Sequence, residues 1–115
     1  MSVYAYWFNE GKATTMVFDE HWHVFHNAYG EALRRARSTD ELHFRSLEVK
    51  SHNVPLIALY VGGEPVALMA YRQRRRKGGT YTNFVGLEEP LSNAVLAEFV
   101  ALANQPLPDD LGEVQ

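Results

Sequence analysis

The sequence predicts an α+β fold, in which a mostly antiparallel sheet of about five to six strands is combined with two helices in the order ββ-α-β-ββ-β-α. Three observations lead to this class. Two apolar runs flank the pair Gly62-Gly63, which is typical of a tight β-hairpin. Strand-like segments follow one another with short turns between them. Only two stretches place their apolar residues at helical spacing.

The first three elements are predicted from the N-terminal third. Residues 3–8 are rich in aromatic and β-branched side chains, and residues 13–18 form their expected partner strand, with Gly11 in the turn. Asp19 is a suitable N-cap for the helix that follows. We expect its buried face to carry the apolar residues that recur at helical spacing: Trp22, Phe25, Tyr29, Leu33 and Ala36. Gly30 lies inside this helix, where we expect it to permit a close approach to the sheet.

The central hairpin follows a further strand over residues 43–50, where apolar and polar side chains alternate. A two-residue turn at the paired glycines places Leu59 opposite Val66. Because Pro65 lacks an N–H group, a third strand beside this hairpin has to begin beyond it. The register predicts one face that is entirely apolar: Ile57, Leu59, Val61, Val66, Leu68 and Ala70.

The C-terminal part predicts one more strand over residues 80–85 and a helix over residues 91–104. That helix is unusually apolar, so we expect it to be buried or to offer a face to a partner, for which a second copy of the chain is one candidate. We expect residues 1–105 to form a single domain. Residues 106–115 form an acidic, proline-containing tail.

A cluster of cations is the first candidate binding site. It forms a loop that ends at Gly78-Gly79 and contains Arg72, Arg74, Arg75, Arg76 and Lys77. Arginine side chains bind phosphates and carboxylates in a bidentate manner, which predicts a surface for an anionic partner. The structural alternative is a solvated hairpin tip, whose charges keep a sheet edge from aggregating.

Aromatic side chains near the N-terminus are the second candidate: Tyr4, Tyr6 and Trp7. Tyrosine and tryptophan are preferred anchors at protein interfaces. Combined with the basic loop, they predict a small non-enzymatic protein-binding domain of the inhibitor, immunity or adaptor type, for which a homodimer is one candidate assembly. We expect no catalytic residues, because the sequence contains no nucleophile motif and no phosphate-binding loop.

The segment 75–80 supports a second reading as a ligand-binding domain. Its residues Arg75, Gly78 and Thr80 are similar to the pyrophosphate-binding pattern Q/R-x-x-G-x-G/A of acetyltransferases of the GNAT class. This resemblance implies an acyl-CoA-binding domain that holds a phosphate group with the basic loop. The pattern departs from the family at Thr80, and a strand rather than a helix is expected to follow it.

Nucleic-acid binding through the same loop is the third reading. The net charge of −3 gives the chain as a whole no attraction for nucleic acid, so this partner is not the one the composition favours. We expect neither a metal nor a cofactor, since of His21, His23 and His26 only the last two can converge on one helix face. The absence of cysteines and of a secretory signal suggests a cytoplasmic protein without a membrane span.

Overall fold

The structure, a computed structural model, describes residues 3–9, 12–18 and 21–105. Its elements follow the predicted order: β1 (Val3–Asn9), β2 (Lys12–Phe18), α1 (His21–Arg35), the short 3-10 helix η1 (Thr39–Glu41), β3 (Leu42–Leu47), β4 (Leu56–Val61), β5 (Glu64–Arg76), β6 (Gly79–Phe84) and α2 (Asn93–Ala103). The predicted α+β class with a mostly antiparallel sheet is confirmed. The expectations for Gly11, Asp19 and residues 106–115, and those for the side chains of His21 and Trp22, lie outside what the structure describes.

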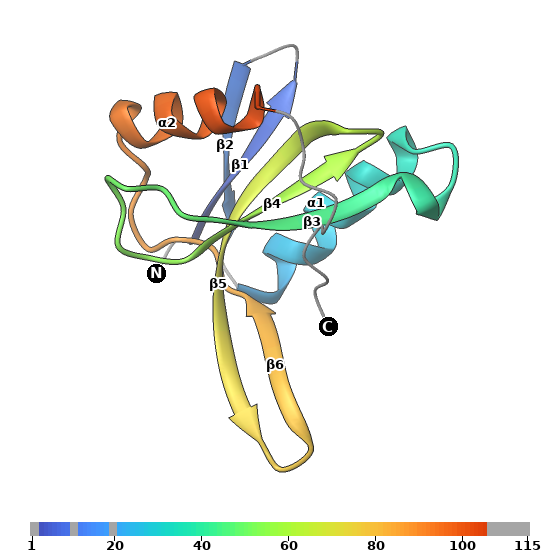
Figure 1. Ribbon diagram of the computed structural model, residues 1–115, viewed down its shortest axis with the longest axis vertical. Helices are drawn as coiled ribbons and strands as arrows, with labels where there is room; N and C mark the ends of the chain where they lie inside the picture. Colours follow the sequence, from blue (N-terminus) through green and yellow to red (C-terminus); the bar gives the residue numbers. More distant parts are fainter. Residues whose placement is uncertain (1–2, 10–11, 19–20, 106–115) are drawn as a thin grey trace.

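The sheet is organised around β5, its longest strand. The strands lie in the order β2-β1-β5-β4-β3, and β6 pairs with the outer half of β5. Every pairing between neighbouring strands is antiparallel. The two helices cover opposite faces of this sheet, and the hairpin of β5 and β6 extends beyond both of them (Figure 1).

The turn between β4 and β5 has the predicted conformation. Gly62 and Gly63 have φ angles of +59° and +88°, the left-handed values that a two-residue reversal of this kind requires. The expectation for Pro65 is also confirmed, because β1 pairs with β5 at Ala67 and Leu68, beyond the proline. The missing N–H of Pro65 therefore interrupts no ladder with β1.

The predicted register of this hairpin is wrong beyond the turn. Leu59 lies opposite Ala67 instead of Val66, and Ile57 lies opposite Met69. Val66 is an extra residue in β5, and such a β-bulge shifts the pairing by one position. The core on the α1 side therefore contains Val3, Ala5, Ile57, Leu59, Val66, Ala67 and Met69. The core on the α2 side contains Tyr6, Phe8, Leu56, Ala58, Tyr60, Leu68 and Ala70.

Helix α1 faces the sheet with a different side from the one predicted. Among the side chains of α1 that the structure describes, the fully buried ones are Val24, Ala28 and Ala32, which recur every fourth position. Phe25 and Tyr29 are half-buried, and Leu33 is exposed. Two of the three buried residues are alanines, so small side chains rather than Gly30 line the contact with the sheet. No heavy atom from elsewhere lies within 4 Å of the position that a Cβ on Gly30 would occupy.

Aromatic stacking anchors the root of the projecting hairpin to α1. The rings of Phe25 in α1 and Phe84 in β6 are stacked, with centroids 4.2 Å apart and planes inclined by 7°. Phe44 of β3 contacts both rings, at centroid distances of 6.2 Å and 5.8 Å. The direction in which the hairpin leaves the domain is therefore fixed by apolar packing at its base.

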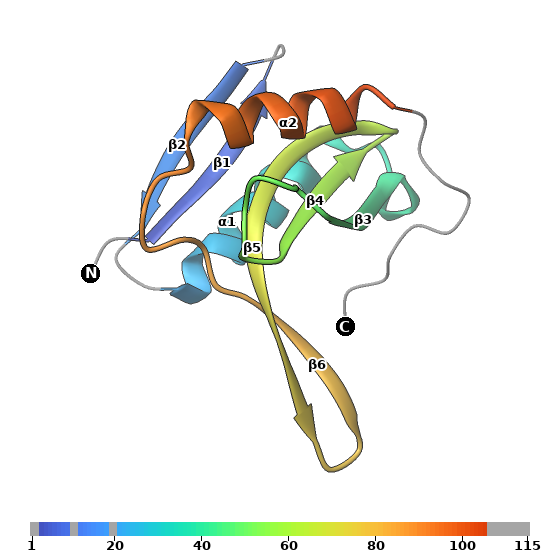
Figure 2. The same ribbon diagram turned by 60° about the vertical axis from the view of Figure 1, so that its left-hand side comes forward.

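Helix α2 begins two residues later than predicted and packs through bulky side chains. The hydroxyl of its N-cap, Ser92, accepts a 3.3 Å hydrogen bond from the Val95 N–H. Val95 and Phe99 are buried, and the Phe99 ring lies 4.5 Å from that of Phe8 in β1. Figure 2 shows α2 crossing the sheet on the face opposite α1, with its last turn near the start of β5.

Candidate functional site

The predicted basic loop is a two-stranded ribbon rather than an irregular loop. The outer half of β5 runs to Arg76 and pairs with β6 residue by residue, from Tyr71 opposite Phe84 to Arg76 opposite Gly79. Residues 72–80 are all exposed, and the ribbon projects from the domain as an arm (Figure 2). We define the arm as residues 71–84. Successive side chains of a strand point to opposite faces, so the register shows on which face of the arm each cation lies.

One face of the arm carries three arginines and an aromatic ring. Because residues that are directly paired share a face, this face comprises Arg72, Arg74, Arg76, Tyr81 and Asn83. Successive arginines on it are about 7 Å apart along the strand. Tyr81 is 45% exposed, although aromatic rings are usually hidden, and it lies directly opposite Arg74. We call this set the arginine face.

The other face of the arm is less charged. Its exposed part contains Gln73 and Arg75, which lie opposite Thr82 and Thr80. Lys77 follows β5 in the turn at the tip of the arm. All five predicted basic residues are therefore exposed on the arm, but the structure divides them between two faces and the tip. Whether they bind a partner stays a prediction.

Charge is strongly separated between the arm and the remainder of the chain. The arm contains five basic residues and no acidic residue. The remainder contains six basic and fourteen acidic residues, a formal charge of −8. Projection beyond the sheet separates the outer cations, from Arg74 to Lys77, from the acids of the described part of the domain body, and the potential at this outer part of the arm is expected to be positive in spite of the net charge of −3.

The acetyltransferase-like pattern does not have the local structure that pyrophosphate binding requires. Gly78 and Gly79 have positive φ angles of +108° and +145°. Gly78 lies with Lys77 in the turn at the tip of the arm, and Gly79 is the first residue of β6. A strand thus follows the turn, as the sequence predicted, and no helix N-terminus is presented to a phosphate there. The acyl-CoA reading is therefore not supported at these residues.

The predicted aromatic surface is exposed only in part. Tyr6 is only 3% exposed and belongs to the core under α2, whereas Tyr4 and Trp7 are half-buried. The Trp7 ring packs on the α1 side, where the guanidinium carbon of Arg35 lies 5.8 Å from its centroid. The structure does not bring these three residues together with the basic residues of the arm.

A hollow of about 740 Å³ opens at the foot of the arm. Its walls come from three segments: the loop between β3 and β4, the start of the arm, and the chain between β6 and α2. The residues that decide its chemistry are His52, Val54, Arg72, Val85, Glu88 and Glu89. Nε2 of His52 is buried and has no hydrogen-bond partner among the described residues. We call this cavity the foot hollow.

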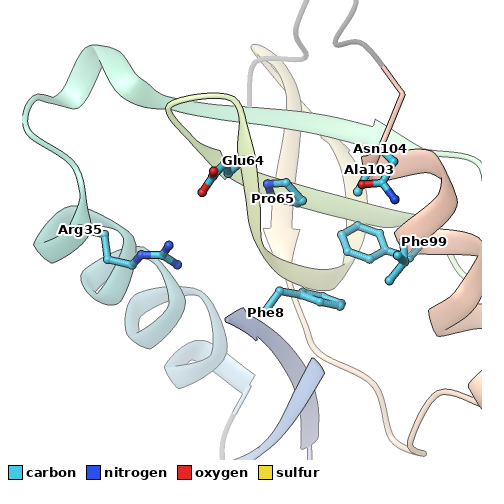
Figure 3. A pocket seen from close by; sticks show the side chains of 8 residues that line it. Phe8, Arg35, Glu64, Pro65, Phe99, Ala103 and Asn104 are labelled. Atoms are coloured by element: carbon cyan, nitrogen blue, oxygen red, sulfur yellow. The ribbon is translucent and has the colours of Figure 1, made fainter. Parts of the chain in front are cut away.

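A smaller hollow of about 280 Å³ lies at the opposite end of the sheet, between the last turns of the two helices. Figure 3 shows the rings of Phe8 and Phe99 at its floor beside Pro65, with Arg35, Glu64 and Asn104 around them. The arrangement is an apolar floor with one cation and one anion at its rim. It shares no residue with the arm.

Potential metal ligands do not cluster in the part of the chain that the structure describes. No group of three or more potential ligands converges there on a metal position. Burial raises the pKa of Tyr60 above its ordinary value of 10.0, an effect that the nearby guanidinium of Arg45 partly offsets. Among the described helices, none has the length and hydrophobicity needed to cross a bilayer.

Sequence reasoning found the cations but missed the side chains that accompany them. Tyr81 and Asn83 complete the arginine face, and the alternation of residues 72–76 with 79–83 was the signal that could have revealed them. His52 was not placed, because only the fold brings its loop beside the arm. Comparison of the chain with protein-family models, curated proteins and solved structures finds no match. The geometry of the arm and its foot is therefore the basis for any functional proposal.

Proposed function

We propose that the chain is a non-enzymatic binding domain that holds nucleic acid through its arm. The observation that carries this proposal is the exposed ribbon of residues 71–84, which contains five cations and no acid. Guanidinium groups form charge-assisted hydrogen bonds with phosphate oxygens, and the energy of such contacts dominates nucleic-acid affinity. An arm that lies along a sugar–phosphate backbone brings these groups to it while the acidic body stays outside.

The side chains of the arm favour nucleic acid over an acidic protein. Protein interfaces depend on buried apolar and aromatic anchors, and residues 72–83 contain no aliphatic side chain beyond the stems of the cations. The arm instead combines arginine, asparagine, glutamine, threonine and one exposed tyrosine. These are the side chains that contact phosphates and base edges and stack on bases. Nucleic acid therefore ranks above an acidic protein as the partner of the arm, whereas the net charge of the whole chain favoured the opposite order.

The isolation of the arm gives a further argument for a partner. A two-stranded ribbon without a third strand or a covering helix is marginally stable in water. Beyond Tyr71 the exposed residues of the arm contribute no buried apolar surface. A polyanion that lies on the arginine face would neutralise the mutual repulsion of Arg72, Arg74 and Arg76, so binding is expected to order the arm.

The proposal is tested by the salt dependence of binding. Fluorescence anisotropy with a labelled oligonucleotide should show that log K falls linearly with log salt concentration, and the double variant R74Q/R76Q should reduce the slope by about 1.4 for a single strand. The matched control R34Q/R37Q also removes two cations, from pairs with Glu31 and Glu41 on the domain body, and should leave the slope unchanged. No binding at low salt, or equal effects of the two double variants, would refute the proposal.

A second candidate, a protein-binding domain of the inhibitor or adaptor type, is favoured by the outer face of α2. Beyond Asn93 at the start of the helix, its exposed residues are Ala94, Ala97, Val100 and Ala101, all apolar, and Val100 is 40% exposed. Glu98 is the helix's only charged residue, and it contacts Lys50 and Ser51. A second copy of the chain could cover this uncharged face. Light scattering after size exclusion tests this: a dimer that V100D converts to a monomer supports it, and a monomeric native chain excludes self-association.

A further inference from the structure

The foot hollow continues the arginine face of the arm. Arg72 is the innermost arginine of that face, and the same residue lines the hollow. A sugar–phosphate backbone that follows Arg76, Arg74 and Arg72 toward the domain therefore reaches this hollow. Its volume of about 740 Å³ is within the range of cavities that bind small organic groups. The hollow is therefore an observation separate from the charge pattern of the arm.

The walls of the hollow are complementary to a flat chemical group that has apolar faces and a polar edge. Val54 and Val85 supply apolar surface, and Val54 is 42% exposed. His52 lines the hollow as well; its Nε2 is enclosed by the protein, has no hydrogen-bond partner among the described residues and does not itself face the opening. Glu88 and Glu89 add two exposed carboxylates, which can only accept hydrogen bonds when ionised. A nucleobase presents this combination of flat apolar faces and hydrogen-bonding edges.

We propose that the foot hollow receives one unpaired base of a single-stranded nucleic acid whose backbone lies on the arginine face. This inference rests on the proposed function and names its partner. The carboxylates of Glu88 and Glu89 repel phosphates, while Arg72 across the hollow attracts them, so the backbone stays on the arm and the base turns inward. A base in a duplex is paired and stacked and cannot enter without being extruded.

The carboxylates also predict which bases the hollow accepts. Glutamate accepts hydrogen bonds from an exocyclic amino group such as that of cytosine, whereas uracil presents a carbonyl oxygen at the same position. Two acceptors that face each other repel. The site should therefore favour an amino-bearing base, and the nucleic acid should be held in a sequence-dependent way at this one position while the arm stays sequence-tolerant.

The test compares oligodeoxycytidine with oligodeoxyuridine of equal length, about 12 nucleotides, in anisotropy titrations with the intact chain. These two probes carry equal charge and differ in the amino or carbonyl group at the base edge. The native chain should bind the cytidine probe roughly tenfold more tightly or better. E88Q/E89Q should reduce this ratio toward one, because an amide can donate to the uracil carbonyl. The control E31Q/E64Q removes two carboxylates that do not line the hollow and should keep the ratio.

Further measurements separate this inference from the arm proposal. R74Q/R76Q should weaken both probes by the same factor and leave their ratio intact. H52A should lower affinity for the cytidine probe without changing the salt slope. Binding that depends on the arm but shows no base preference, or a duplex of the same length that binds as tightly as the single strand, would overturn the base site alone. Absence of all binding at low salt would overturn both proposals.

Discussion

The phenolic oxygen of Tyr6 accepts a 2.6 Å hydrogen bond from the backbone N–H of Leu91. The same hydroxyl donates to the carbonyl oxygen of Leu91 over 3.5 Å. Tyr6 belongs to β1, whereas Leu91 lies in the segment that leads into α2 and lines the foot hollow. One buried side chain thus satisfies both backbone groups of a residue 85 positions away, and it fixes one wall of the hollow to the sheet.

Tyr6→Phe should therefore destabilise the domain although it keeps the ring. The Leu91 N–H would lose its partner in a buried position, which costs about 1–3 kcal/mol of unfolding free energy. Urea denaturation measures this loss. The control Tyr4→Phe changes a half-buried tyrosine in the same strand and should cost less. If both variants unfold at the same urea concentration, the hydrogen bond of Tyr6 contributes nothing.

Glu98 connects α2 to the loop between β3 and β4. Its carboxylate accepts a 2.6 Å hydrogen bond from the Ser51 hydroxyl, and it also accepts from the backbone N–H groups of Lys50 and Ser51. The Ser51 hydroxyl is the main cause that lowers the pKa of Glu98 below its ordinary value of 4.5, against a smaller rise from desolvation. The charged form is therefore favoured in the folded state.

This shift predicts the pH dependence of stability at Glu98. A carboxyl group with a lowered folded-state pKa contributes stability that is fully present above 4.5 and is lost as pH falls through the folded-state value. The difference in unfolding free energy between the native chain and Glu98→Gln should be constant from neutral pH down to that range and should shrink below it. Ser51→Ala should weaken this dependence. A difference that stays constant in acid would contradict the assignment.

The hairpin register shows what the sequence could and could not predict. The Gly62-Gly63 turn, the apolar character of both strands and the restriction at Pro65 were readable, because each depends on local chemistry. The bulge at Val66 was not readable. Both faces of β4 and of the inner half of β5 are apolar, so a shift of one residue there exposes nothing, and the hydrophobic pattern cannot choose between the two registers.

Helix α1 shows the same limit in another form. Its large apolar residues form a regular stripe, which predicted a buried face that includes Leu33. The structure turns the helix toward Val24, Ala28 and Ala32 instead. Small side chains allow a helix to approach a sheet closely. At the edge of that contact, Tyr29 stacks on Phe44 of β3 and Phe25 stacks on Phe84 of β6. The amount of space beside the sheet is a tertiary property that the periodicity of the sequence does not contain.

Gly30→Ala should stabilise the domain. Gly30 lies inside α1, and no heavy atom from elsewhere lies within 4 Å of where its Cβ would be. Replacing a glycine by alanine in a helix interior gains about 1 kcal/mol, and the midpoint of thermal unfolding should rise by about 4 °C. The control Gly63→Ala changes an equally open position with φ of +88° and should destabilise the domain. A loss of stability in Gly30→Ala would show that this helix needs its glycine.

Gly86→Ala should be among the most damaging single substitutions in the chain. A Cβ at this position would overlap Cγ1 of Val3 and lie 3.0 Å from the carbonyl oxygen of Tyr4. The φ angle of Gly86 is +42°, so backbone strain adds to the steric overlap. Together the two effects should lower the free energy of unfolding by about 3 kcal/mol or more. Gly63→Ala, which meets no atom within 4 Å, serves as the control for strain alone. Equal losses in the two variants would show that the close packing around Gly86 is not needed.

Substitutions of Tyr81 distinguish the contribution of base stacking to nucleic-acid affinity from that of the cations on the arm. It lies opposite Arg74 on the arginine face, and a base that stacks on its ring would add about 1–3 kcal/mol to single-strand affinity. Tyr81→Ala should therefore weaken binding roughly fivefold or more at every salt concentration and leave the salt slope unchanged, because no cation is removed. Tyr81→Phe keeps the ring and should restore affinity. Arg75→Gln, which removes one cation from the other face, should weaken binding less than Arg74→Gln does. This order requires the backbone of the bound strand to lie on the arginine face, since charge alone would make the two arginine variants equivalent.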